Sequence, residues 1–233
     1  MADITLVLFD IDGTLLLSDG AGRRAIHRAL TELFGSTGPE KHRFDGKTDR
    51  QIVRELMRLA GHEDPVIDER MDALLERYVS YLTTELADPA HASRLMPGVR
   101  ELLDALAVRD DVILGLLTGN LVEGARAKLA AVGIDFARFR VGAYGSDHEV
   151  RAELPGIAQA RTRELLDIAV HGEQVVVIGD TPADLTCGRA IGARAIGVAT
   201  GTHSVEELLA HQPHAVFADL SDTHRVVRAI TSP

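Results

Sequence analysis

The stretch Leu6-Val-Leu-Phe-Asp-Ile-Asp-Gly-Thr-Leu15 decides the fold of this chain, because it joins a short apolar run to a pair of acids. Five of the six residues at positions 4–9 are apolar, as expected for a strand that is covered on both faces. Asp10 and Asp12 follow this strand, and a Gly-Thr pair then permits a tight turn. Side chains two apart on an extended backbone point the same way, here toward the crevice where open α/β sheets bind ligands. Their like charges repel, so the pair requires a cation, a shared proton or both.

The composition is typical of a globular protein with one large domain, or with a core domain and an insert. The chain has 233 residues, 45% of them hydrophobic and 26% charged. No apolar run approaches the roughly 20 residues that span a bilayer, and the first strand begins almost at Met1, so we expect neither a membrane segment nor a signal peptide. The single cysteine, Cys187, cannot form an internal disulfide and favours a cytoplasmic location.

The charge balance limits the possible partners. A net charge of −10 argues against non-specific binding of nucleic acid. An anionic substrate would therefore need a metal ion or a few placed cations. The ten histidines show no paired spacing, which argues against a zinc site. Of the 25 basic residues, three are lysines (Lys41, Lys47 and Lys128), so an arginine can stand where a related protein has a lysine.

The spacing of apolar residues divides the chain into two regions. Apolar positions at helical spacing predict three helices, at about 21–34, 49–59 and 66–86, and no strand between residues 19 and 88. Short apolar runs that alternate with helical patterns then predict five further strands, at 112–117, 139–142, 174–179, 195–198 and 215–217. We therefore expect an α/β fold with a Rossmann-like, doubly wound parallel sheet formed by residues 1–17 and 94–233. Residues 18–93 form an inserted helical domain in this interpretation.

Polar side chains recur where these strands end. Thr118 and Asn120 follow the second strand of the sheet, and Asp180 and Asp184 follow the fourth. Parallel strands place all these ends along one edge. Three converging carboxylates form a hard oxygen site that suits Mg²⁺. The hydroxyl of Thr118, beside the start of a helix, suits a phosphate oxygen.

The motifs Asp10-Ile-Asp-Gly-Thr-Leu15, Thr118-Gly-Asn120 and Gly179-Asp-Thr-Pro-Ala-Asp184 resemble the haloacid dehalogenase-like hydrolase superfamily. Their order and spacing are similar to its phosphatase branch, which includes phosphoglycolate phosphatases and β-phosphoglucomutase-like proteins. The family also has a lysine before the helix that precedes the fourth strand, but no lysine follows Lys128. Arg151 is our candidate for its replacement. The alternative, that Arg151 is an ordinary residue at a helix start, stays open.

The resemblance implies a mechanism and a set of site residues. Asp10 would attack the phosphorus and form an aspartyl-phosphate, and Asp12 would protonate the leaving oxygen and then activate water. Dehalogenases of the family lack an acid at the position of Asp12, so this residue favours phosphate-ester chemistry. The implied Mg²⁺ ligands are Asp10, the backbone carbonyl of Asp12, Asp180 and Asp184. The implied contacts to the transferred phosphate are Thr118, Gly119, Asn120 and Arg151.

The helical insert resembles the cap of this family, which closes over the strand ends and reads the leaving group. Gly46-Lys47-Thr48-Asp49 would face the site, with Lys47 either contacting substrate or lying in a solvated turn. The expected substrate is a small phosphorylated metabolite. The alternatives are a sugar phosphomutase, an enzyme like phosphonoacetaldehyde hydrolase with Lys47 as its Schiff-base lysine, and a non-enzymatic phosphate-ester-binding protein. The sequence leaves monomer and dimer open.

Overall fold

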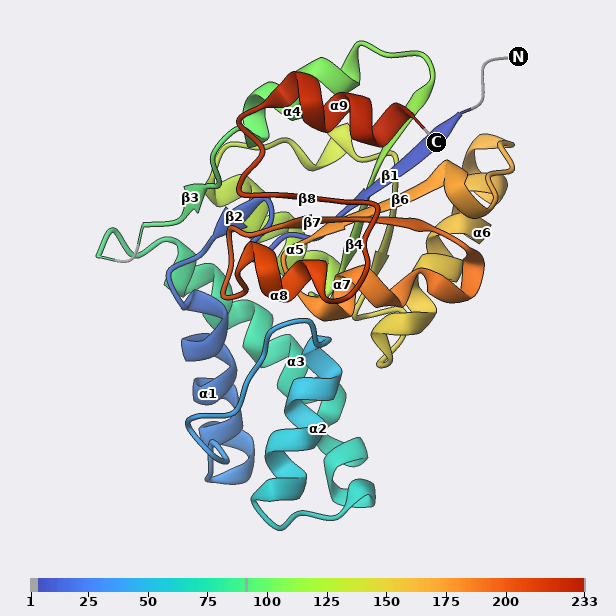
Figure 1. The fold of residues 1–233 in the computed structure, drawn as a ribbon. Coiled ribbons are helices and arrows are strands. Elements are labelled where there is room, and N and C mark those ends of the chain that lie inside the picture. Colours follow the sequence, from blue (N-terminus) through green and yellow to red (C-terminus); the bar gives the residue numbers. More distant parts are fainter. Residues whose placement is uncertain (1–3, 91, 233) are drawn as a thin grey trace.

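The protein is an α/β structure built on one parallel sheet of six strands (Figure 1). The computed structural model describes residues 4–90 and 92–232. The strand order is β5-β4-β1-β6-β7-β8, with all neighbours parallel. The strands are β1 (Thr5–Phe9), β4 (Val112–Thr118), β5 (Val141–Tyr144), β6 (Val175–Gly179), β7 (Arg194–Val198) and β8 (Ala215–Phe217). The expected Rossmann-like α/β fold class is therefore confirmed.

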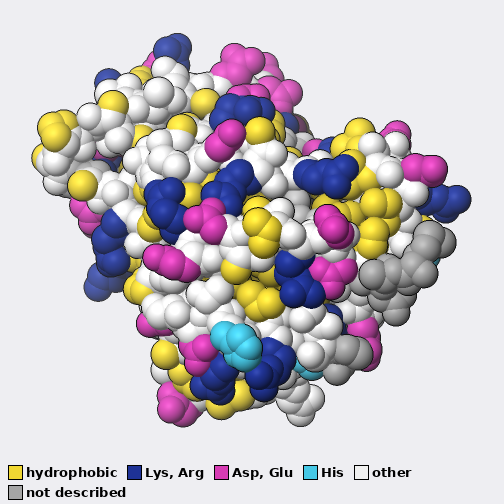
Figure 2. Space-filling model, turned by 90° about the horizontal axis from the view of Figure 1, so that it is seen from above, with side chains coloured by type: hydrophobic (Ala, Val, Ile, Leu, Met, Phe, Trp, Pro, Cys, Tyr) yellow, Lys and Arg dark blue, Asp and Glu magenta, His cyan; other side chains and the backbone are white. Residues whose placement is uncertain are grey.

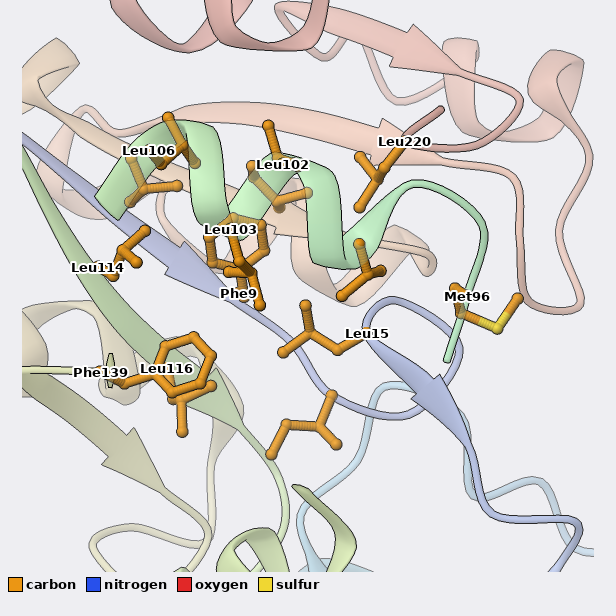
Figure 3. Close-up of a cluster of buried hydrophobic side chains, with 14 of the residues drawn as sticks. Phe9, Leu15, Met96, Leu102, Leu103, Leu106, Leu114, Leu116, Phe139 and Leu220 are labelled. Atoms are coloured by element: carbon orange, nitrogen blue, oxygen red, sulfur yellow. The ribbon is translucent and has the colours of Figure 1, made fainter. Parts of the chain in front are cut away.

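Helices cover both faces of this sheet, and for this reason successive residues of its central strand are all buried. Leu6 and Leu8 of β1 point into a cluster shared with α6 (Leu154–Leu166). Val7 and Phe9 point to the other face, into a cluster shared with α4 (Val99–Ala107) and α9 (Thr223–Thr231). Figure 3 shows Leu103 of α4 beside Phe9 of β1, with Leu102 and Leu106 on the same helix. Each such side chain contributes about 1.5–3 kcal/mol when it is fully buried.

The remaining core helices connect the strands. They are α5 (Val122–Ala131), α7 (Pro182–Cys187), α8 (Val205–Leu209) and four 3-10 helices at Phe136–Arg138, Arg151–Glu153, Gly172–Gln174 and Arg189–Ile191. Helix α6 ends at Leu166, because Asp167 adopts a left-handed conformation with φ of 56°. Strand β5 begins two residues later than expected, because a 3-10 helix and its cap occupy residues 135–139.

Three helices within residues 18–93 form a separate layer at one end of the sheet (Figure 1). They are α1 (Ala21–Phe34), α2 (Asp49–Leu59) and α3 (Asp64–Leu86), and their buried apolar side chains form a cluster of their own. We call residues 18–93 the helical insert. Its α2 begins where the Thr48 hydroxyl accepts the Gln51 N–H, a typical N-terminal cap.

The two chain segments that lead into and out of the helical insert pair with each other. They form the antiparallel strands β2 (Leu16–Leu17) and β3 (Arg94–Leu95). The sequence did not predict this ribbon, because a strand of two residues has no periodic pattern. The ribbon holds the entry and the exit of the helical insert side by side.

The surface carries charges of both signs. On the face seen in Figure 2, Lys and Arg side chains are interspersed with Asp and Glu, and no extended basic surface forms there. Among the described residues, no helix combines the length and the apolar character that crossing a membrane requires.

Candidate active site

The topology brings the predicted strand-end residues together. Because β1 lies between β4 and β6, Asp10, Thr118 and Asp180 lie at adjacent strand ends. The Asp10 N–H donates to the carbonyl of Ile178, 2.9 Å away, so the backbone still follows the sheet at the first acid. All three side chains are buried. The position of each is therefore fixed by the sheet and not by a mobile loop.

Asp10, Asp180 and Asp184 form a compact acidic cluster. One oxygen from each carboxylate lies within 4.8 Å of the others. Burial raises the pKa of Asp180 well above its ordinary value, and the charges of Asp184 and Asp10 raise it further. Burial also raises the pKa of Asp10, despite the opposing effect of Arg151. Buried carboxylates with this excess of negative charge are hard oxygen donors, and the chemistry of the set fits Mg²⁺.

Glycines make room for Asp180. Gly13 has φ of 86°, and a Cβ there would lie 2.3 Å from the Asp180 Oδ2. A Cβ at Gly201, in the loop after β7, would lie 1.8 Å from the same oxygen. The Thr14 hydroxyl donates to the Asp180 Oδ1 at 3.2 Å. The Gly-Thr pair after the two acids thus shapes the pocket of Asp180, beyond the turn that the sequence predicted.

Arg151 contacts two of these acids. Its Nη2 donates to the Asp10 Oδ1 at 2.9 Å and to the Asp184 Oδ1. Burial lowers the pKa of Arg151, but Asp184 and Asp10 raise it by more, so the guanidinium stays charged. Its Nε is buried and has no hydrogen-bond partner among the described residues. Arg151 therefore places a positive charge beside Asp10.

Asp184 lies behind the cavity and supports the acidic cluster from there. Its Oδ2 accepts hydrogen bonds from the Thr181 N–H at 3.0 Å and the Thr181 hydroxyl at 2.7 Å, which form a capping box at the start of α7. A Cβ at Gly179 would lie 2.2 Å from the Asp184 Cγ, so the strand end has no space for a side chain there. Nearby Cys187 is buried, which raises the pKa of its thiol to about 12 and makes it a poor nucleophile.

Asp12 is held by a residue that the sequence analysis set aside. The Nζ of Lys128, on α5, donates to both oxygens of Asp12 at 2.8 and 2.7 Å. Asn120 completes the group: its Nδ2 donates to the Asp12 Oδ2 at 2.7 Å and its Oδ1 accepts from Lys128 at 2.6 Å. Lys128 has no role in the sequence analysis, because it precedes the segment in which the family has its lysine. The scarcity of lysine in this sequence was the signal that could have identified it.

The helical insert closes a cavity of about 470 Å³ over these groups. The Asp49 N–H donates to the Gly119 carbonyl at 2.8 Å, and the Asp49 Oδ2 accepts the Leu121 N–H at 2.8 Å. A Cβ at Gly119 would lie 1.9 Å from the Lys47 carbonyl, so the two backbones touch. The predicted residues that line the cavity are Asp10, Asp12, Lys47, Thr118, Gly119, Asn120, Arg151 and Asp180. Of the predicted site residues, only Asp184 is absent from this lining.

Lys47 lines the cavity, but its ammonium group is paired within the helical insert. Its Nζ lies 2.5 Å from the Glu55 Oε2 and 3.2 Å from the His42 Nε2. Burial raises the pKa of Glu55, but hydrogen bonds from Lys47 and Gln51 lower it by more. Lys47 therefore reaches the cavity as a largely neutralised cation.

The fold and the site together define a class, namely α/β enzymes that gather carboxylates and a cation at the carboxyl ends of parallel strands. Comparison with known proteins gives the family. The model of haloacid dehalogenase-like hydrolases matches residues 7–189. The chain belongs to this family, as its motifs predicted.

Named relatives agree with this assignment. A 5′-nucleotidase of Pseudomonas aeruginosa is 30% identical over 96% of this chain and 95% of its own length. A phosphoglycolate phosphatase of Rhodospirillum rubrum is 29% identical over 92% of this chain and 87% of its own. In fold, the chain is similar to a hydrolase from Pseudomonas syringae, with a TM-score of 0.75 at 22% identity over 99% of this chain and 100% of that one. The prediction of a phosphatase-type hydrolase of phosphate esters is therefore confirmed at this level.

Proposed function

We propose that this protein is a Mg²⁺-dependent phosphatase of small organic monoesters, and that Asp10 is its nucleophile. The observation that carries the proposal is the pairing of Asp10 and Asp12 in one cavity, each held by a different cation. A nucleophile and a proton donor must act on opposite sides of the same phosphorus–oxygen bond. Separate anchors allow the two carboxylates to take these separate roles.

The reaction divides into two transfers. A carboxylate oxygen of Asp10 bonds to the phosphorus while the bond to the ester oxygen breaks, and Asp12 gives that oxygen a proton. Asp12 then takes a proton from water as the water oxygen attacks the phosphorus of the aspartyl-phosphate. Inorganic phosphate leaves and the Asp10 carboxylate is restored. Thr118, Gly119 and Asn120 line the cavity and would surround the transferred phosphoryl group. The Arg151 Nε–H, which has no partner among the described residues, would be available to its oxygens.

Mg²⁺ would be held by Asp10, Asp180 and the backbone carbonyl of Asp12, with Asp184 supporting it. When bound, it would neutralise charge between the nucleophile and the phosphate. The acidic cluster described above supports this assignment, since it holds more carboxylates than Arg151 can neutralise.

The size of the cavity supports a small substrate. About 470 Å³ is within the range of small-molecule sites. The helical insert would act as the cap that excludes water and reads the leaving group. The names of the relatives put 2-phosphoglycolate and 5′-nucleotides first among the candidates.

A panel of phosphate esters tests the proposal. With Mg²⁺ we expect release of inorganic phosphate from at least one small monoester, and loss of that release with EDTA or in Asp10→Asn. The expected loss in Asp10→Asn is at least about 10³-fold, because no other group replaces the covalent step. Incubation with a hexose 1-phosphate separates the mutase alternative, since a mutase returns an isomerised sugar phosphate. Full activity of Asp10→Asn would contradict the mechanism.

A further inference from the structure

Lys128 is a buried lysine whose three donors all have acceptors. Its side chain is 5% exposed, and its Nζ lies within 2.8 Å of three oxygens. Two of these oxygens belong to Asp12 and the third belongs to Asn120. An ammonium group has three hydrogens to donate, so this arrangement uses all of them. Burying a lysine is costly unless its charge is paired and its hydrogen bonds are made, and both conditions are met here.

Asp12 differs from the other acids of the site. Its side chain is 42% exposed, whereas the side chain of Asp10 is 9% exposed and that of Asp184 is fully buried. The packing of the sheet therefore encloses the side chain of Asp12 less than those of Asp10 and Asp184. Lys128 and Asn120 together donate to both oxygens of Asp12 and restrain the rotation of its side chain. Asn120 belongs to a motif, whereas Lys128 restrains Asp12 from α5, an element that carries none of the motif residues.

We propose that Lys128 is a positioning residue, which with Asn120 fixes the carboxyl group of Asp12 against the leaving oxygen of the substrate. This inference rests on the proposed function, because it assigns Lys128 to the proton transfer that Asp12 performs. A misplacement of about 1 Å at a reacting group can cost about 10²-fold in rate. An exposed, rotating carboxyl group would spend much of its time in orientations from which it cannot donate a proton to the leaving oxygen.

The composition of the chain supports a specific requirement for lysine. Among its 25 basic residues, three are lysines. A guanidinium is a planar fork, whereas an ammonium directs three donors from one compact centre, as the three surrounding oxygens require. In a chain that mostly uses arginine, a buried lysine at this position indicates a requirement for the donor arrangement of an ammonium group and not only for a positive charge.

The test uses two esters that differ in their need for a proton. The leaving group of p-nitrophenyl phosphate departs readily as an anion, whereas the alcohol of an alkyl phosphate such as glycerol phosphate needs a proton from Asp12. We expect Lys128→Met to lower kcat by about 10- to 100-fold on the alkyl ester and by less than about threefold on p-nitrophenyl phosphate, with KM changed by less than about twofold. Lys41→Met is the matched control, since Lys41 is exposed and lies outside the cavity lining.

A double-mutant cycle with Asp12→Asn shows whether Lys128 acts through Asp12. In the Asp12→Asn background, adding Lys128→Met should lower kcat on the alkyl ester by less than a further factor of about three, because the group that Lys128 positions is already lost. Equal losses on both esters, a change in KM alone, or fully independent effects in the cycle would each overturn the inference. Thermal melts check the fold, and Lys128→Gln, which keeps amide donors, replaces Lys128→Met if that variant does not fold. If Asp12→Asn loses as much kcat on p-nitrophenyl phosphate as on the alkyl ester, the proposed role of Asp12 has failed. If Asp12→Asn loses more on the alkyl ester but Lys128→Met does not, the positioning role of Lys128 alone is refuted.

Discussion

At the level of single residues, Lys47 shows how a partner changes what a cation can do. The sequence placed this lysine in a loop facing the site, and the structure places its Nζ against Glu55 and His42. A paired cation attracts an anionic substrate less than a free one does, because part of its field is already neutralised. Its proposed contact with substrate is therefore a modest contribution to binding.

Two substitutions with opposite expected effects test Lys47. Lys47→Ala should raise KM about 3- to 10-fold with little change in kcat, which corresponds to about 0.7–1.4 kcal/mol of binding. Glu55→Gln removes the competing charge and should lower KM. Steady-state kinetics on the best substrate of the ester panel measure both, with Lys41→Ala as the control. If KM is the same in both variants as in the wild type, Lys47 does not read the substrate.

At the level of elements, Asp49 links the first turn of α2 to the start of α5. Its carboxylate accepts the Leu121 N–H at 2.8 Å and the Tyr78 hydroxyl at 3.4 Å, and burial raises its pKa to about 6. Since Leu121 is the N-terminal cap position of α5, the helical insert satisfies a donor that belongs to the core. The contact between the helical insert and the core thus caps the N-terminus of α5.

Removing this acceptor should destabilise the closed arrangement. Asp49→Ala leaves the Leu121 N–H and the Tyr78 hydroxyl without their partner, and we expect a loss of about 1–3 kcal/mol in the free energy of unfolding. Asp49→Asn keeps an oxygen acceptor and should lose less than about 1 kcal/mol. Urea denaturation measures both values. Equal losses in Asp49→Asn and Asp49→Ala would show that the negative charge, and not the hydrogen bonds, matters here.

At the level of the whole molecule, the acidic cluster makes stability depend on pH and on metal. The pKa values of Asp10 and Asp180 are raised from an ordinary value of 3.8, so between 3.8 and the raised values the folded chain holds more protons than the unfolded chain. The free energy of unfolding therefore falls as pH rises through this window. A bound cation replaces the protons and reverses this loss.

Thermal melts test this coupling. In EDTA we expect Tm to be lower at about pH 8 than at about pH 6, and the rise in Tm on adding MgCl2 to be larger at the higher pH. Asp180→Asn should show a smaller pH dependence in EDTA and a smaller rise with MgCl2, because it lacks one titrating ligand. A rise in Tm that is equal at both pH values would contradict the coupling.

The parts of the molecule that could be predicted from sequence are those with a repeated or ordered signal. The apolar runs predicted the six parallel strands of the sheet, and parallel connectivity then predicted that Asp10, Thr118 and Asp180 would meet. Lys128 escaped prediction because it approaches Asp12 from a helix 116 residues further along the chain. Its contact depends on how α5 packs, which motif order does not encode. The pairing of Lys47 with Glu55, eight residues further along on α2, was also missed, because the loop before a helix has no periodic pattern.

The ribbon of β2 and β3 has a mechanical consequence. A single chain segment between the core and the helical insert would allow free rotation about itself. Here two segments run side by side and are paired as strands, with Leu16 opposite Leu95 and Leu17 opposite Arg94. Two hydrogen-bonded segments side by side resist twisting about their common axis far more than they resist bending across it. We therefore expect any opening of the helical insert to follow one arc about this ribbon, and closing to restore the hydrogen bond from the Asp49 N–H to the Gly119 carbonyl.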